Sequence, residues 1–182
     1  MLKTKLSSTI QSMVKMSMLV AISIVMVSLI HFPIFPAVPF LEYDPADISI
    51  LIGTFVFGAP AGLLLTVLTA VIQGITVSAG SGIYGIIMHM IATGTLVLIS
   101  GTIYQRHKTK KAAIISMASG IIAMSCVMIA ANLLITPLFM GVSRDIVWDL
   151  MPFIIFFNVI KAGINCLVTF MVYKKTAAFL RR

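Results

Sequence analysis

Five long apolar runs constrain the fold of this chain more than any other feature of its sequence. A bilayer core of about 30 Å is crossed by about 20 helical residues, so runs of this length predict membrane-spanning helices. The predicted spans are residues 16–30, 60–77, 84–104, 112–136 and 152–173. Composition agrees, because 60% of the 182 residues are hydrophobic and only 10% are charged, whereas a soluble domain carries about 25% charged residues. Lipid is therefore the expected solvent for most of the surface.

A shorter apolar run, residues 45–57, lies between the first two spans. Asp44 is its expected N-cap, Pro45 suits the first helical position, and Asp47 falls where the acid of a capping box belongs. A helix of this length spans only ~20 Å, which is too short to cross a bilayer alone but acceptable when other helices surround it. The sequence therefore predicts an all-α polytopic membrane protein, a six-helix bundle in which residues 1–182 form one membrane-embedded domain.

The charged residues predict the orientation of this bundle. With six spans, both termini and the connections after the second and fourth helices share one side of the membrane. The basic residues on that side are Lys3, Lys5, Lys15, Arg106, Lys108, Lys110, Lys111, Lys174, Lys175, Arg181 and Arg182, and the acids on the other side are Glu42, Asp44, Asp47, Asp145 and Asp149. Because basic connections stay in the cytoplasm, we expect both termini there. The net charge of +8 follows from this arrangement and does not indicate a nucleic-acid partner.

The first outside connection, residues 31–44, is too apolar for a solvated loop. Its prolines at 33, 36 and 39 exclude regular helix and favour an extended, polyproline-like course. Irregular backbone of this kind is tolerated near a membrane where it packs on protein or lines a cavity. Two interpretations stay open: a cap over helix ends, or the lid of a ligand pocket. The second outside connection, residues 78–84, is glycine-rich and would let a ligand approach the backbone closely.

Lys161 is the most informative polar residue. It lies ~14 Å along the last span, near the middle of the bilayer. An ionisable group there costs at least ~2.5 kcal/mol and needs a partner or a water-filled cavity. Asn158 and Asn165 lie on the same helical face. Since no acid lies inside any predicted span, we expect either a polar knot between helices or a polar ligand as the partner of Lys161.

Other polar residues lie at similar depth or nearer the outside. Asn132 and Gln73 are each close to the outer end of a span, where they contact a ligand or bridge helices, and bridging is favoured for Gln73. His89 suits a buried core position and a ligand contact equally well. Cys126 and Cys166 lie in apolar runs without Cys-x-x-Cys spacing, so we expect buried apolar residues rather than metal ligands.

Four segments of the chain carry a resemblance to a known family. They are Phe40-Leu-Glu-Tyr-Asp-Pro-Ala-Asp47 with Leu51-Ile-Gly53, Ile87-Met-His-Met-Ile-Ala-Thr-Gly94, Ala131-Asn-Leu-Leu-Ile-Thr-Pro137, and Phe157-Asn-Val-Ile-Lys-Ala-Gly163. Together and in this order, they resemble the substrate-binding (S) components of energy-coupling factor (ECF) vitamin transporters, specifically the riboflavin branch. The resemblance covers nearly the whole chain, although no single segment is a catalytic signature.

The resemblance implies a fold and a ligand. Members of the family are six-helix bundles in the bacterial cell membrane, with both ends cytoplasmic, and they capture the vitamin from outside in a pocket under the first loop. Riboflavin would be the transported ligand rather than a cofactor, and FMN is left open as a second ligand. Asn158 and Lys161 match the family's Phe-Asn-x-x-Lys pattern, whose polar groups contact the flavin. The expected substrate-binding residues are Leu41, Glu42, Tyr43, Tyr84, His89, Asn132, Asn158, Lys161 and Asn165.

The resemblance also implies partners. In the family, energy comes from a transmembrane coupling subunit and two cytoplasmic ATPase subunits, and a small-residue motif on the first helix docks against the coupling subunit. Ser17 and Ala21 are the expected counterpart of that motif, with Ser in place of the usual Ala. The third helix departs from the family, because Thr66, Thr69 and Ala70 stand where relatives carry Glu, Lys and Asn.

Two other functions compete with riboflavin binding. The first is an S component for another vitamin, such as thiamine or folate. The second is a membrane-embedded enzyme, which would need paired acids, a nucleophile with a base, or a metal cluster at one depth. His89 is alone and the acids are placed at the outer face, so we expect no catalytic or metal-binding residues. The chain also lacks a Gly-x-x-x-x-Gly-Lys-Ser/Thr segment and is not expected to hydrolyse ATP itself.

Overall fold

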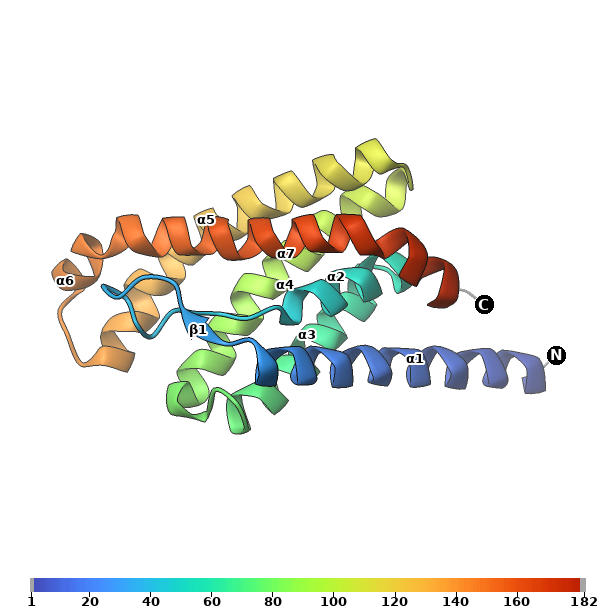
Figure 1. The fold of residues 1–182 in the computed structure, drawn as a ribbon, viewed down its shortest axis with the longest axis horizontal. Helices are drawn as coiled ribbons and strands as arrows, with labels where there is room; N and C mark the ends of the chain where they lie inside the picture. The colour runs from blue at the N-terminus through green and yellow to red at the C-terminus, as the bar shows by residue number, and fades with distance from the viewer. Residues whose placement is uncertain (1, 181–182) are drawn as a thin grey trace.

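The computed structural model describes residues 2–180 as a bundle of helices (Figure 1). Within these residues the α-helices are α1 (Leu2–Leu29), α2 (Ala46–Phe57), α3 (Ala59–Ile75), α4 (Gly82–Arg106), α5 (Lys110–Met140), α6 (Arg144–Asp149) and α7 (Met151–Leu180). A 3-10 helix, η1 (Ala79–Ser81), precedes α4, and two short strands, β1 (Phe32–Pro33) and β2 (Glu42–Tyr43), pair antiparallel in the first connection. Helix α1 begins and helix α7 ends at the same end of the bundle (Figure 1).

Six of the seven helices in the described part of the chain coincide with the six predicted segments. The seventh helix, α6, has no predicted counterpart, because its six residues are too few and too polar to form an apolar run. Within residues 2–180, four stretches are long and apolar enough to cross a bilayer, namely Thr9–Leu29, Ala79–Arg106, Lys110–Met140 and Met151–Thr176. Helices α2 and α3 are shorter, so six crossings with cytoplasmic termini stay a prediction.

The start of α2 differs from the predicted capping arrangement. Pro45, rather than Asp44, occupies the N-cap position, and Asp44 Oδ1 accepts a hydrogen bond from the backbone N–H of Ala46 at 3.1 Å. Proline has no N–H of its own, so the carboxylate meets the next free donor along the chain. The carboxylate of Asp47 does not close a capping box, because it accepts hydrogen bonds from side chains of two other helices.

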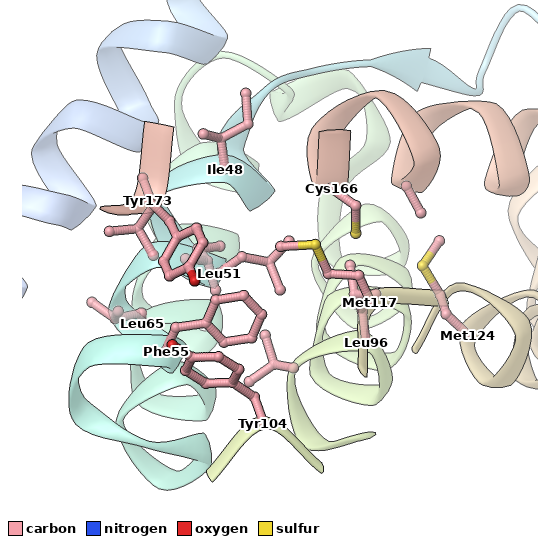
Figure 2. Packing of buried hydrophobic residues seen from close by; sticks show 14 of the residues in the cluster. Ile48, Leu51, Phe55, Leu65, Leu96, Tyr104, Met117, Met124, Cys166 and Tyr173 are labelled. Atoms are coloured by element: carbon pink, nitrogen blue, oxygen red, sulfur yellow. The ribbon is translucent and has the colours of Figure 1, made fainter. Parts of the chain in front are cut away.

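Helix α2 lies at the centre of the bundle. It contacts α1, α3, α4 and α7, and its residues from Ala46 to Phe55 are buried. Near its C-terminal end the rings of Phe55 and Tyr104 are 4.3 Å apart, and the ring of Tyr173 packs against both (Figure 2). Gly58, at φ 100°, then turns the chain into α3. Because protein surrounds it, a helix of only twelve residues is stable at membrane depth.

The outward faces of the long helices are apolar. Large hydrophobic side chains such as Val25, Leu138 and Leu167 are exposed on α1, α5 and α7. Lipid suits these faces better than water does. Cys126 is also exposed, so the prediction that it is buried is wrong, whereas Cys166 is buried as expected. An apolar residue on a lipid-facing helix has no need of burial, so apolarity alone did not predict its position.

The first connection folds onto the protein instead of extending. Between β1 and β2 the chain makes two tight turns, in which the N–H of Val38 donates to the carbonyl of Phe35 and the N–H of Leu41 donates to that of Val38. The predicted extended course is therefore wrong for these residues. Val38 is fully buried in a small cluster with Val147 of α6 and Ile154 of α7. This cluster fixes the connection against α6 and α7.

Candidate functional site

A cavity lies beneath the first connection, with walls from α3, α4, α5 and α7. Its polar lining includes His31, Glu42, Asp44, Asp47, Gln73, Ser78, His89, Thr93, Asn132, Thr136, Asn158 and Lys161. Its apolar lining includes Phe40, Leu41, Tyr84, Met88, Met124, Met128, Ile135, Phe139 and Phe157. A space with a polar side and an aromatic, methionine-rich side suits a flat ligand that carries hydrogen-bonding groups.

Lys161 finds its partner within the protein. Its Nζ lies 2.7 Å from Oδ2 of Asp44, and both side chains are largely buried. Of the two expected partners of Lys161, a polar contact within the protein is the one that the structure shows. Its acid had been placed at the outer face, but the segment before α2 carries Asp44 into the bundle. Burial alone would raise the pKa of Asp44, but the ammonium of Lys161 and the N–H of Ala46 lower it to about 2. Asp44 is thus a carboxylate, and one of the three Lys161 N–H groups is committed to it.

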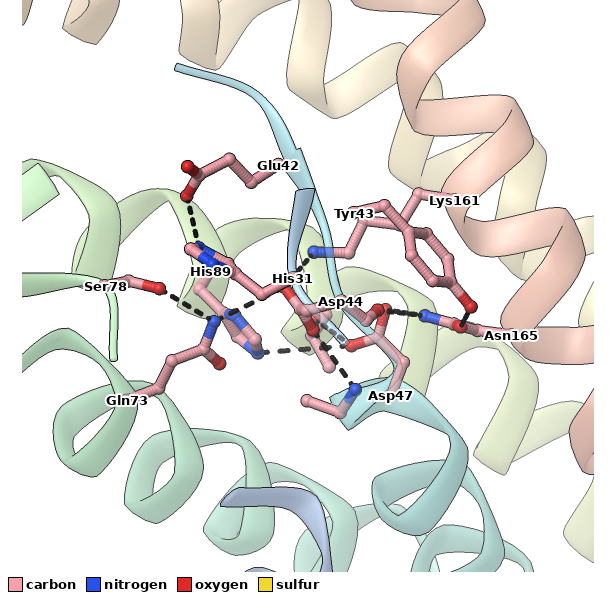
Figure 3. Close-up of polar contacts among 12 residues, drawn as sticks. His31, Glu42, Tyr43, Asp44, Asp47, Gln73, Ser78, His89, Lys161 and Asn165 are labelled. Carbon is pink, nitrogen blue, oxygen red and sulfur yellow. Dashed lines mark hydrogen bonds and ion pairs between the residues drawn. The ribbon is translucent and has the colours of Figure 1, made fainter. Parts of the chain in front are cut away.

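Asn165 connects Asp44, which precedes α2, with Asp47 in the first turn of that helix (Figure 3). Its Nδ2 donates to the backbone carbonyl of Asp44 at 3.0 Å and to Oδ2 of Asp47 at 3.1 Å. Its Oδ1 accepts a hydrogen bond from the hydroxyl of Tyr43 at 3.0 Å. Asp47 also accepts a hydrogen bond from Thr93 of α4 at 2.7 Å. Asn165 and Tyr43 therefore hold the cluster in place from behind the cavity wall.

Two buried polar atoms of the cavity lining have no hydrogen-bond partner among the described residues. They are Oε1 of Gln73 and Nε2 of His89. The nearest acidic oxygen to Nε2 of His89 belongs to Asp47 and is 4.0 Å away, too far for a hydrogen bond. The amide nitrogen of Gln73, in contrast, donates to Asp44 and to Ser78. Unpaired buried polar atoms are unfavourable, so these two are the atoms that a ligand would most readily stabilise.

Two asparagines on the facing helices α5 and α7 also line the cavity. Asn132 donates to the carbonyl of Met128 at 2.8 Å and accepts from the hydroxyl of Thr136 at 2.9 Å. Asn158 donates to the carbonyl of Ile154 at 2.8 Å. Each amide is therefore held by the preceding turn of its own helix. Such pre-oriented amides select a ligand by the pattern of its donors and acceptors.

Aromatic and polar contacts lie among the cavity-lining residues near the first connection. The ring of Phe139 lies 6.2 Å from that of Phe40 in the first connection and 5.9 Å from that of Tyr84 on α4. Nε2 of His31, just after α1, lies 2.5 Å from Oε2 of Glu42 in β2. Of these contacts, the one between Phe40 and Phe139 joins the first connection to α5. The connection also lines the cavity, through His31, Phe40, Leu41 and Glu42, which favours the lid over the simple cap among the two interpretations of this segment.

The structure brings most of the predicted substrate-binding residues to one place. Those lining the cavity are Leu41, Glu42, Tyr84, His89, Asn132, Asn158 and Lys161. Tyr43 and Asn165 lie behind the wall, as described above. The sequence analysis missed Asp44 and Asp47 as site residues because it placed the acids at the outer face. It also missed His31, and it favoured helix bridging for Gln73. For Gln73 the available signal was an amide at the same predicted depth as Asn132.

The chain matches the family model for the ECF transporter, substrate-specific component, over residues 11–173. It therefore belongs to this family of membrane transport proteins, as the resemblance implied. Among individual proteins it is similar to the riboflavin transporter RibU of Staphylococcus aureus (strain TCH60), with 27% identity over an alignment 177 residues long that covers 93% of this chain and 92% of that protein.

Two solved structures share the fold. The S component of a bacterial ECF transporter superposes with a TM-score of 0.81 at 27% identity, covering 96% of this chain and 99% of the other. ThiT from Listeria monocytogenes superposes with a TM-score of 0.69 at 13% identity, covering 95% and 98% of the two chains. The relatives are transport components rather than enzymes.

Proposed function

We propose that this chain is the riboflavin-binding subunit of an ECF-type uptake transporter. The observation that carries the proposal is the cavity under the first connection, in which Lys161, Asn158 and Asn132 face aromatic and methionine side chains. The similarity to a riboflavin transporter over nearly the full length of both chains supports the choice of ligand. On this proposal, the vitamin enters from outside and is held beneath the lid formed by β1, β2 and the turns between them.

The polar side of the cavity suits the ring carbonyls of a flavin. Because Asp44 keeps Lys161 as an ammonium and accepts only one of its N–H groups, further N–H groups remain for carbonyl oxygens of the ligand. Asn158 is one helical turn away on the same helix and supplies a second directional contact. A ligand with the wrong pattern would leave these groups unpaired, at a cost of about 1–3 kcal/mol for each group.

The proposal extends to the partners of the transporter. Energy would come from a separate transmembrane coupling subunit and two cytoplasmic ATPase subunits, with both termini of this chain in the cytoplasm. Ser17 and Ala21 are exposed on α1, as a docking surface requires. Small residues at this spacing permit close helix–helix approach within lipid. The chain alone is then expected to bind the vitamin without concentrating it.

Equilibrium binding to the purified protein in detergent tests the proposed ligand. Riboflavin fluorescence should be quenched on binding, and Lys161→Met and Asn158→Ala should each weaken affinity by about 5- to 150-fold. Ser125→Ala is the matched control, because Ser125 is a buried, unpaired polar residue outside the cavity lining. Unchanged riboflavin affinity in both cavity variants would overturn the site. Concentrative uptake into vesicles that contain this chain alone would overturn the division of labour with separate energising subunits.

Thiamine is the second candidate, and one observation favours it. The cluster beside the cavity contains two buried carboxylates, Asp44 and Asp47, against the single ammonium of Lys161. A surplus of buried negative charge suits a cationic ligand better than a neutral one. Titration with thiamine, folate and FMN beside riboflavin decides between them. Tighter binding of thiamine than of riboflavin would replace the proposed ligand.

A further inference from the structure

Gln73 presents an unused acceptor beside the cavity. Four buried side-chain polar atoms in the described part of the chain lack a partner, on Thr69, Gln73, His89 and Ser125, and only Gln73 and His89 among these residues line the cavity. Gln73 is 6% exposed. It comes from α3, and helix bridging was its favoured role on sequence grounds.

The orientation of the Gln73 amide follows from its neighbours. Its Nε2 lies 3.3 Å from Oδ2 of Asp44 and 3.2 Å from Oγ of Ser78 (Figure 3). Asp44 is an ionised carboxylate and can only accept, so the nitrogen of the amide has to face it. The carbonyl oxygen Oε1 is consequently held away from Asp44 with no donor to meet. The amide is thus an acceptor whose direction the charged cluster determines.

We propose that Gln73 is a specificity-determining residue, whose carbonyl oxygen accepts a hydrogen bond from a donor group of the bound ligand. The inference rests on the proposed function and deepens it. Lys161 offers only donors to a ligand, whereas Gln73 offers an acceptor, so the two together select a molecule that carries both carbonyls and a donor. Riboflavin has two kinds of donor, the imide N–H of its ring and the hydroxyls of its ribityl chain.

The test compares three ligands on native protein and on Gln73→Met, which preserves side-chain length but removes the acceptor. The ligands are riboflavin, 3-methylriboflavin, which lacks the imide N–H, and lumiflavin, which lacks the ribityl hydroxyls. The substitution is expected to weaken riboflavin binding by about 5- to 30-fold. If Gln73 accepts from the imide N–H, this loss should fall to less than about twofold for 3-methylriboflavin. If it accepts from a ribityl hydroxyl, the loss should fall to that level for lumiflavin instead. Gln73→Ala, which removes bulk as well, is the second variant and should show the same dependence on the ligand.

Thr69→Val is the matched control, because it removes an unpaired buried polar atom one turn earlier on α3, outside the cavity lining. It should leave the affinity for all three ligands unchanged. The same loss for all three ligands in the Gln73 variants would mean that Gln73 acts only by holding Asp44, and would overturn the inference. If the native protein binds no riboflavin, the proposed function itself fails, and that result is distinguishable from a failure of Gln73 alone.

Discussion

The two partners of the Asp44–Lys161 pair are expected to be unequal in their importance for stability. Oδ2 of Asp44 and Nζ of Lys161 are 2.7 Å apart, and the two side chains are 4% and 13% exposed. Removing one partner of a buried ion pair costs about 3–5 kcal/mol, because it leaves a buried charge without compensation. The variants differ, however, in the charge that remains, because Asp47 lies in the same cluster and is joined to Asp44 through Asn165.

Counting two carboxylates and one ammonium, the native cluster has one surplus negative charge. Lys161→Met doubles that surplus and is expected to lower the free energy of unfolding by about 3–5 kcal/mol. Asp44→Asn leaves Asp47 as a counter-charge for Lys161 and keeps a hydrogen-bond acceptor. It is therefore expected to lower the free energy of unfolding by only about 1–2 kcal/mol. The double variant should cost less than the sum of the two, with a coupling of about 1–3 kcal/mol.

Thermal unfolding of the ligand-free proteins in one detergent measures these differences. For a chain of this length about 2–4 °C of midpoint corresponds to 1 kcal/mol. Lys161→Met should therefore lower the midpoint by about 6–20 °C, and Asp44→Asn by about 2–8 °C. An equal or larger loss for Asp44→Asn would refute the charge count. Strict additivity in the double variant would refute the pairing itself.

Two further predictions concern acid and helix packing. Because the pKa of Asp44 is lowered to about 2, its carboxylate stabilises the folded state above about pH 4, and this contribution is lost as the pH falls through about 2. The melting midpoint of the native protein should therefore fall between about pH 7 and about pH 3, and that of Asp44→Asn should fall less. Gly62→Ala should lower the free energy of unfolding by about 1–3 kcal/mol, or the midpoint by about 2–12 °C, because its Cβ would collide with the side chains of Thr54 and Val97. Gly163→Ala is the matched helical control, since a Cβ there would meet no described atom within 4 Å, and it should be neutral or stabilising. Equal losses for the two glycines would contradict this packing argument.

Much of the fold was predictable because lipid imposes a simple demand on sequence. A helix that crosses a bilayer must be apolar over most of its length, and the long runs therefore located α1, α4, α5 and α7 directly. Helix α6 was not predicted, because it is not an apolar membrane-crossing run. It is a short polar helix whose Val147 packs under the first connection, and only tertiary contact gives it a reason to form.

The site was predictable only in part, because depth was easier to infer than pairing. Lys161, Asn158 and Asn132 stand out as polar residues inside apolar runs, and all three line the cavity. His31 and Gln73 give weaker signals, since each is an ordinary residue for the end of a membrane helix. Their place at the cavity follows from contacts that sequence alone does not indicate, between His31 and Glu42, 11 residues apart, and between Gln73 and Asp44, 29 residues apart.

The error about Lys161 has a physical cause that the sequence already contained. Asp44 and Asp47 were placed at the outer face, because Asp44 ends a connection and Asp47 stands at the beginning of an apolar helix. Yet α2 has only twelve residues and is ~20 Å long, against a bilayer core of about 30 Å. If its end at Phe57 lies near the inner face, its beginning must lie about 10 Å below the outer one. That depth is close to the ~14 Å estimated for Lys161 along its own helix. A short apolar helix that begins with acids therefore indicates a buried charge cluster. The difference between the length of that helix and the thickness of the bilayer core predicts how deep the basic partner lies on a neighbouring helix.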